Sequence, residues 1–189
     1  QGRTDRPALK GSDRARREGT GPMGSGDRGS ISEQWYKAKY ESGATAHVEF
    51  KKSDQTPVDP KKPTQGQTPR DLPLTKDRVP DLVNGDQLKD VKHVKSVLDQ
   101  GDRAQIDEYV NVLVGQKITI NGKEYNLKKA TVVFTEPVGG GKNADYIAAK
   151  TSKDLEFEIF NRSGERRTIN EASLERHQRD ARALAADIR

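Results

Sequence analysis

The chain has 189 residues, a formal net charge of +5 at pH 7 and no cysteine. Only 31% of its residues are hydrophobic and 33% are charged, so we expect a core that leaves some segments outside it. Without cysteine, disulfides, thiolate nucleophiles and thiolate zinc sites are excluded, and no apolar stretch is long enough for a membrane span. With three scattered histidines, metal chemistry must depend on carboxylates, which favours hard ions such as Mg²⁺.

The N-terminal segment differs in composition from the rest. Residues 1–29 are rich in Gly, Arg, Asp and Ser and contain almost no large apolar side chains. This composition predicts a flexible or loosely attached linker or tail. Because the chain begins at Gln1 rather than Met, we expect a carrier protein upstream of it. Residues 30–189 are expected to form the folded domain.

The first half of this domain alternates between ordered and irregular segments. Ser30 or Ser32 can cap a helix that ends before Gly43, and alternating apolar positions predict a strand over residues 45–50. Residues 52–77 contain five prolines among polar residues. Proline restricts the backbone and removes a hydrogen-bond donor, so this segment is predicted to be a long loop.

Two Asn-Gly pairs, Asn84-Gly85 and Asn121-Gly122, predict two β-hairpins, because both residues accept the backbone of a tight turn. The flanking strands are predicted over residues 78–84 with 87–94, and 117–120 with 124–127. Between the hairpins, apolar residues at helical spacing predict a helix over residues 104–115.

The C-terminal part continues the mixture of helices and strands. The predicted elements are a buried strand over 131–135, a flexible connection at 139–142, a helix over 143–150, a strand over 155–160, and a helical extension within 161–189 that Asn170 caps. This order predicts a mixed α/β domain, whose central sheet contains both parallel and antiparallel neighbours.

The segment around the first hairpin carries the candidate chemistry. Asp90 and Lys92 are two positions apart on a predicted strand, so their side chains lie on the same face. Asp81 precedes the turn on the neighbouring strand, roughly 5 Å away in a hairpin. Two carboxylates and an ammonium group gathered on one face can hold a divalent ion and a nearby phosphate.

The sequence Pro80-Asp81 followed by Asp90-x-Lys92 resembles the PD-(D/E)xK nuclease superfamily, which has the restriction-endonuclease fold. The resemblance implies a restriction-endonuclease-like mixed central sheet flanked by helices. It also implies Mg²⁺ or Mn²⁺ bound by Asp81, Asp90 and the carbonyl of Val91, with Lys92 as the catalytic lysine that orients or polarises the attacking water. The chain departs from many members of the family in having Asp90 where they have Glu.

Two further features extend this resemblance. Gln105 and Tyr109 are four positions apart on a predicted helix, which places both on one face, and they resemble the Gln-x-x-x-Tyr motif of RecB-like members. The superfamily core also begins with a helix that often supplies an acid to the site. Here the candidates are Glu33, which we favour, and Glu41.

The wider pattern over residues 78–109 resembles the restriction-endonuclease-fold toxin domains at the C-termini of bacterial polymorphic toxins, including Rhs-type effectors. That resemblance implies a secreted DNase effector that acts in the cytoplasm of a target bacterium, with a cognate immunity protein as its partner. Tyr109, Lys95 and Lys142 are the residues expected to contact nucleic acid.

Other interpretations stay open at this point. An RNA- or tRNA-cleaving toxin would present the same catalytic groups, because both substrates contain phosphodiesters. A non-enzymatic, degenerate nuclease fold would keep the elements without bringing Asp81, Asp90 and Lys92 together. His93 faces away from Asp90 by strand alternation and is expected to pack, and His47 and His177 have no partner at ligand spacing and are expected to be surface groups.

Overall fold

The structure is a computed structural model that describes residues 25–52, 74–93, 98–115, 117–135, 138 and 141–176. Predictions for residues 1–24, for most of the proline-rich loop, for Lys95 and for His177 therefore lie outside the described residues. Among those that are described, no helix is long and apolar enough to cross a membrane.

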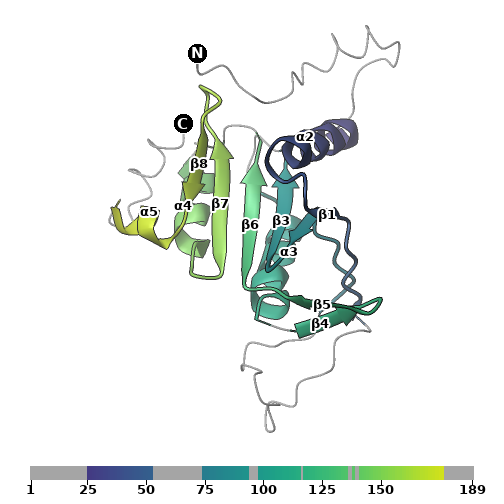
Figure 1. The fold of residues 1–189 in the computed structure, drawn as a ribbon. Coiled ribbons are helices and arrows are strands. Elements are labelled where there is room, and N and C mark those ends of the chain that lie inside the picture. The colour runs from purple at the N-terminus through teal and green to yellow at the C-terminus, as the bar shows by residue number, and fades with distance from the viewer. Residues whose placement is uncertain are drawn as a thin grey trace, which may run out of the picture.

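A six-stranded mixed sheet forms the centre of the domain (Figure 1). Its strands, in spatial order, are β1 (Thr45–Ala46), β2 (Leu82–Asn84), β3 (Gln87–Lys92), β6 (Lys129–Phe134), β7 (Leu155–Phe160) and β8 (Arg166–Ile169). The pairs β3–β6 and β6–β7 are parallel, whereas β1–β2, β2–β3 and β7–β8 are antiparallel. The predicted mixed α/β sheet is thus confirmed.

Both predicted hairpins are present. Gly85 in the β2–β3 turn has a φ of 60°, and Gly122 in the second turn has a φ of 79°, values that favour glycine. The second hairpin, β4 (Lys117–Ile120) with β5 (Lys123–Asn126), forms a separate two-stranded sheet. The two turns differ: Asn121 and Gly122 are the central residues of the second, whereas Asn84 pairs with Gln87 in the first, whose central residues are Gly85 and Asp86.

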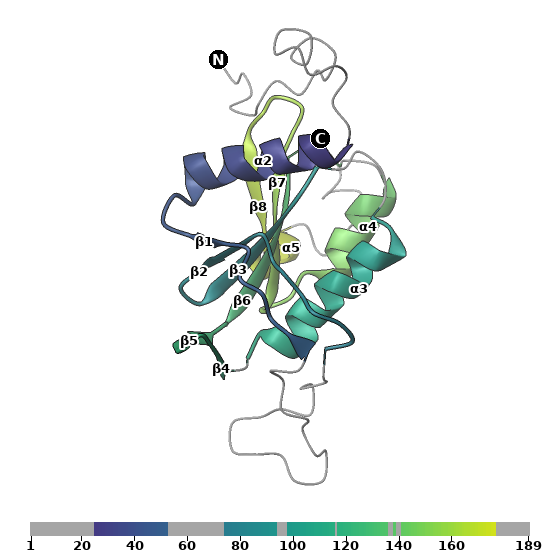
Figure 2. The ribbon, with the colours of Figure 1, turned by 90° about the vertical axis from the view of Figure 1, so that its right-hand side faces the viewer.

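Helices cover both faces of the large sheet (Figure 2). On one face lies α2 (Ser25–Tyr40); on the other lie α3 (Gln100–Glu108), the π-helical turn η2 (Tyr109–Leu113) and α4 (Gly141–Lys150). Each face has its own apolar cluster: Leu88 packs with Ile106 on the α3 side, and Val91 packs with Tyr36 on the α2 side. Strand alternation therefore directs Asp90 and Lys92 toward α3.

Three predicted boundaries at the N-terminal side were wrong. Helix α2 begins at Ser25, inside the predicted tail, because extending an existing helix costs less free energy than nucleating a new one. The strand predicted over 45–50 stops after Ala46, since His47 has a φ of 56°. The strand predicted over 78–84 is regular only from Leu82.

The C-terminal extension predicted over residues 161–189 was wrong in part, because it contains strand β8 before its helix. Three of the four residues of β8 are exposed, so this edge strand lacks the apolar alternation that identifies a strand in sequence. The helix that follows, α5 (Glu171–Arg176), has the predicted cap: the backbone N–H of Ser173 donates to Asn170 Oδ1 at 3.0 Å. In addition, α4 begins at Gly141 rather than at Asn143, so Lys142 lies in a helix and not in a loop.

Candidate functional site

Asp81 and Asp90 lie opposite one another at the open end of the β2–β3 hairpin. The register pairs Leu82 with Lys89, so Asp81, one residue before β2, lies across from Asp90. Residues directly opposite in an antiparallel pair share a face. Asp81 Oδ2 also accepts a hydrogen bond of 2.6 Å from the backbone N–H of Val91. The predicted convergence of the two acids on neighbouring strands is therefore found.

Burial and neighbouring carboxylates dominate the environment of Asp81. Burial is the largest cause that raises the pKa of Asp81, and the charges of Asp90 and Glu33 raise it further, to about 9, against the lowering effect of the Val91 N–H. A buried carboxyl group beside other carboxylates retains its proton to higher pH than a free aspartate does. A divalent cation would replace that proton and remove the repulsion.

The segment that precedes Asp81 is hydrogen-bonded to helix α3. Arg78 pairs with Phe50 through two backbone hydrogen bonds of 2.8 and 2.9 Å, and its Nε donates to Glu108 at the end of α3. Glu108 also accepts hydrogen bonds from the backbone and the hydroxyl group of Thr75, at 2.7 and 2.6 Å. These contacts fix Asp81 relative to α3.

Lys92 lies between the acid pair and α3. Its Nζ is 2.7 Å from Asp90 Oδ2 and 3.2 Å from Asp102 Oδ1, and it donates a 2.8 Å hydrogen bond to Gln105 Oε1. Burial by itself would lower the pKa of Lys92, but the charges of Asp90 and Asp102 outweigh it and raise that pKa. Lys92 is thus a cation held in place by β3 and α3 together.

The helix α3 is positioned by its own cap. Asp99 Oδ1 accepts a 2.7 Å hydrogen bond from the backbone N–H of Asp102, which fixes the first turn. Gln105 follows one turn later and accepts a hydrogen bond from Lys92. Asp102 was missed by the sequence analysis, although its spacing of three from Gln105 is a helical neighbour relation that signals a shared face.

Tyr109 reaches the site but does not reach the surface. Its hydroxyl group donates to Asp90 Oδ1 at 3.5 Å, and the residue is fully buried. Burial, then the charge of Asp90, keeps the pKa of Tyr109 well above its usual range. The expected contact of Tyr109 with nucleic acid was therefore wrong, because the apolar core covers the ring. Tyr109 opens the π-helical turn, a distortion that is frequent at functional sites.

Glu33 extends from α2 to the other side of Asp81. Ligand atoms of Glu33, His47 and Asp81 all lie within 4.8 Å of one another, and Glu33 Oε1 is 2.6 Å from His47 Nε2. His47 is a surface group as expected, with its side chain 63% exposed, but it has partners that the sequence did not reveal. Its partners come from distant parts of the chain, so no sequence spacing could reveal them.

Glu41, the alternative acid, belongs to a different cluster. Its carboxylate is 2.7 Å from Lys89 Nζ and accepts a 2.8 Å hydrogen bond from Asn84 Nδ2. Lys89, buried on the α2 side, is also 3.2 Å from Glu158, which bonds Tyr36 and Arg166. This buried ionic cluster docks α2 on the sheet, and so it positions Glu33.

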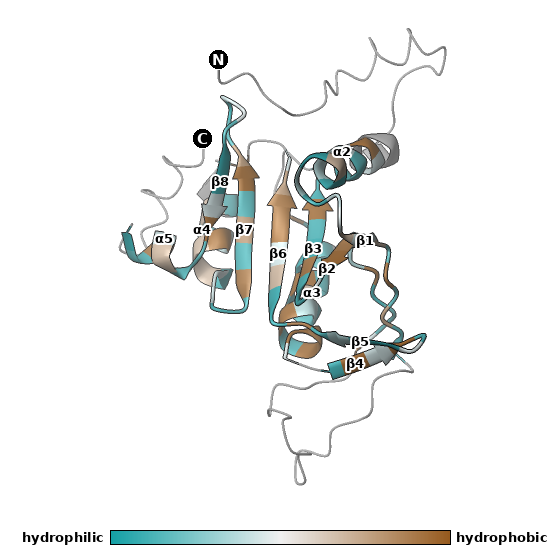
Figure 3. Cartoon of the chain, viewed as in Figure 1, coloured by the Kyte–Doolittle hydropathy of each residue, from teal (hydrophilic) through white to brown (hydrophobic). Residues whose placement is uncertain are grey.

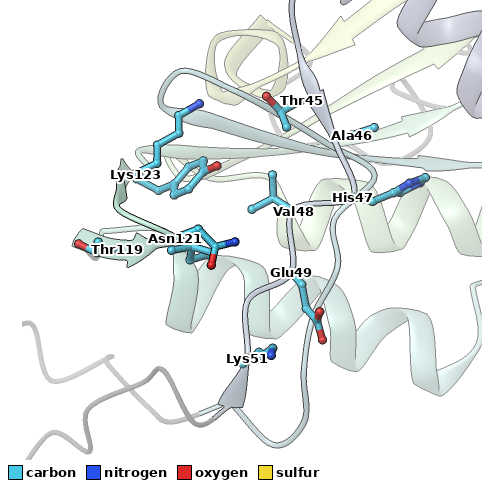
Figure 4. Close-up of a pocket in the computed structure, with 11 residues that line it drawn as sticks. Thr45, Ala46, His47, Val48, Glu49, Lys51, Thr119, Asn121 and Lys123 are labelled. Atoms are coloured by element: carbon cyan, nitrogen blue, oxygen red, sulfur yellow. The ribbon is translucent and has the colours of Figure 1, made fainter.

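A groove of about 700 Å³ lies between residues 45–51 and the β4–β5 hairpin (Figure 4). Lys51, Asn121 and Lys123 are among its polar lining residues. His47 belongs to both the groove lining and the acid cluster, and Figure 4 shows its ring directed away from the hairpin. Residues 45–51 therefore form a wall with the groove on one side and the acids on the other.

The side chains present fit a divalent cation. Asp90 Oδ2 is buried, and within the described part of the chain no hydrogen-bond donor of good geometry reaches it, although Lys92 forms an ion pair there. Buried carboxylate oxygens such as Asp90 Oδ2 are suitable ligands for Mg²⁺ or Mn²⁺. The carbonyl oxygen of Val91 is a predicted ligand. The contact that the structure shows for Val91 is the hydrogen bond from its N–H to Asp81.

Strand β3 contains charged side chains that are buried within the domain. Figure 3 shows hydrophilic segments within β3 and also within β7. In β3, both Lys89 and Asp90 are buried. Buried charges are costly unless they are paired or bind a cation, which indicates a functional or specifying role.

Comparisons of the chain with protein-family models, with curated proteins and with solved structures give no significant match.

Proposed function

We propose that this chain is a metal-dependent nuclease that hydrolyses phosphodiester bonds, with DNA as the favoured substrate. The observation that carries this proposal is the convergence of Asp81, Asp90 and Lys92, with Lys92 held by Gln105. A buried acid pair in contact with a buried ammonium group is costly to keep, which supports a catalytic use of this site.

The order of the elements supports a restriction-endonuclease-like fold. An acid-bearing helix, α2, precedes an antiparallel hairpin, β2–β3, and this hairpin is followed by helix α3 with its Gln105 and Tyr109. These are the elements on which the resemblance to PD-(D/E)xK nucleases depends. Strand β6 then returns parallel to β3 and completes the centre of the sheet.

In the proposed mechanism, Asp81, Asp90 and Glu33 would hold a Mg²⁺ or Mn²⁺ ion, which would polarise the phosphate and lower the pKa of a water molecule. Lys92 is cationic, so it acts by stabilising negative charge that develops at phosphorus, and not as a base. Gln105 and Asp102 keep the ammonium group in one position. Water adds to phosphorus and loses a proton to solvent, while the bond between phosphorus and the leaving oxygen breaks and that oxygen takes a proton from solvent.

The groove beside the site offers a path for the substrate strand. Lys51 and Lys123 lie along it, and the β4–β5 hairpin forms one side. Lysines bind phosphates through sequence-independent attraction, and polar side chains such as Asn121 can hydrogen-bond sugar and phosphate oxygens. A strand whose scissile phosphate lies at Asp90 would continue past His47 into this groove.

The biological setting proposed here follows the resemblance to polymorphic toxins. The chain would be the toxic domain of a secreted effector, delivered by a carrier and active in the cytoplasm of a target bacterium. A cognate immunity protein would be its principal protein partner and would protect the producing cell.

Expression inside bacteria tests this proposal. Without an immunity protein, the unaltered chain should arrest growth and degrade plasmid and chromosomal DNA, whereas Asp90→Asn should be harmless. Asp145→Asn, which changes an exposed acid on α4, is the matched control and should remain toxic. Intact DNA together with degraded tRNA would show that the substrate is RNA rather than DNA. Equal toxicity of Asp90→Asn and the unaltered chain would show that the active site lies elsewhere.

A further inference from the structure

We infer that His47 is a metal ligand, and that the site consequently prefers Mn²⁺ to Mg²⁺. The ion is the one that the proposed function requires, but its binding can be measured without nucleic acid. His47 lies outside the set of residues that the nuclease resemblance implies, and the sequence alone assigned it no role.

The first support is the geometry of three ligand atoms. One atom each from Glu33, His47 and Asp81 lies within 4.8 Å of the others. Two ligands on one ion with bonds of about 2.1 Å lie roughly 3 Å apart when adjacent and about 4.2 Å apart when opposite. Small side-chain rotations therefore suffice to place all three around one cation.

The second support is that the backbone holds His47 beside Asp81. The N–H of His47 donates a 3.1 Å hydrogen bond to the carbonyl oxygen of Asp81. This bond continues the β1–β2 pairing by one residue, and it ties the two chain segments together where both carry a ligand side chain. The backbone of His47 is thus hydrogen-bonded to the residue that carries the Asp81 carboxylate.

The third support is the neighbouring carboxylate. Asp90 is 2% exposed and lies opposite Asp81, and its Oδ2 has the Lys92 ammonium as an ion-pair partner at 2.7 Å. A histidine–glutamate contact at a surface is common by itself. Here it adjoins Asp81 and Asp90, so three carboxyl groups gather near one lysine, and this excess of acidic groups favours a bound cation over a single ion pair.

The types of ligand atom determine which divalent ion the site prefers. Mg²⁺ prefers oxygen ligands and tolerates imidazole poorly, whereas Mn²⁺ accepts both nitrogen and oxygen and binds nitrogen-containing sites more tightly along the divalent series. One imidazole with two or three carboxylates is therefore a site for a manganese-like ion. Mg²⁺ would have to use the carboxylates alone.

Calorimetric titration of the purified full chain with MnCl₂ and, separately, MgCl₂ tests this inference. We expect Mn²⁺ to bind at least about tenfold more tightly than Mg²⁺, and His47→Asn to weaken Mn²⁺ binding by about 10- to 100-fold with little change for Mg²⁺. Asparagine tolerates the left-handed backbone of residue 47, so the fold should survive. His47→Ala serves as a second variant, and Glu124→Gln, an exposed acid of the hairpin, is the control.

Pulsed electron paramagnetic resonance of the Mn²⁺ complex provides the structural signature. The unaltered chain should show coupling of the ion to a histidine nitrogen, and both His47 variants should lack it. Unchanged nitrogen coupling in the variants, or equal losses of Mn²⁺ and Mg²⁺ affinity, would overturn the inference. Tight Mn²⁺ binding without any cleavage of nucleic acid would overturn the proposed function and leave the role of His47 intact.

Discussion

Asp81 accepts a hydrogen bond from the backbone N–H of Val91, so the first acid of the site is fastened to the strand that carries the second acid and the lysine. Asp90 precedes Val91 on that strand and Lys92 follows it. Three chemical groups are therefore positioned by one hairpin rather than by separate loops. Rigid elements hold catalytic groups more precisely than loops do, which favours a catalytic use of this arrangement.

The raised pKa of Asp81 predicts how stability depends on pH without metal. In the folded chain its pKa is well above that of an unfolded aspartate, so the folded state binds the proton more tightly. Stability is then greatest below the unfolded pKa and is lost as pH rises toward the folded pKa. Urea midpoints measured in EDTA should fall between pH 5 and pH 9, and Asp81→Asn should flatten this decline. A midpoint that rises with pH in the unaltered chain would contradict the raised pKa of Asp81.

Lys92→Met should separate metal binding from turnover. The change removes a charge aimed at the transition state, and losses of about 10² to 10³ in kcat are typical for such groups. The carboxylates remain, so bound Mn²⁺ should still be detected by calorimetry. Lys153→Met, at an exposed position, is the control and should keep full activity. Normal turnover in Lys92→Met would remove Lys92 from the mechanism.

Lysines of the groove should affect substrate binding rather than chemistry. Lys51→Ala and Lys123→Ala should raise KM for DNA with little change in kcat, because their charges meet phosphates away from the scissile bond. Each loss should reduce the slope of log affinity against log salt by about 1. Lys128→Ala, exposed and outside the groove lining, should change neither quantity. Equal effects of all three variants would show that the groove is not the path of the substrate.

The buried ionic cluster predicts a large effect on stability. Lys89→Met leaves the carboxylates of Glu41 and Glu158 near one another without their shared cation, and breaking a buried pair in this way costs about 3–5 kcal/mol. Urea denaturation should show this loss for the single variant. Adding Glu41→Gln should recover part of it, because Glu41 is the carboxylate that loses its ion pair, whereas Glu158 keeps Arg166. A single variant as stable as the parent would mean that the cluster does not dock α2.

The sequence was sufficient for the features that local rules determine. The Asn84-Gly85 turn and the alternation along β3 predicted that Asp81 and Asp90 meet, and the helical spacing predicted that Gln105 and Tyr109 share a face. These inferences depend on neighbours within one hairpin or one helix. They hold because turn chemistry and periodicity act over a few residues.

Features that depend on tertiary contact could not be predicted. His47 meets Glu33 only after α2 packs against the sheet, and the burial of Tyr109 depends on the core that surrounds η2. Strand β8 was missed because its charged residues face solvent at a sheet edge. Buried Tyr36 marks the packed face of α2.

Cleavage of supercoiled plasmid by the purified chain tests the central claim most directly. We expect nicked and linear DNA with Mn²⁺ or Mg²⁺, no cleavage in EDTA, and loss of cleavage in Asp81→Asn, Asp90→Asn and Lys92→Met, while Asp145→Asn cleaves as the parent does. Total RNA treated in parallel identifies the preferred nucleic acid. The account is contradicted if neither nucleic acid is cleaved with either metal, or if cleavage persists in EDTA and in all three site variants.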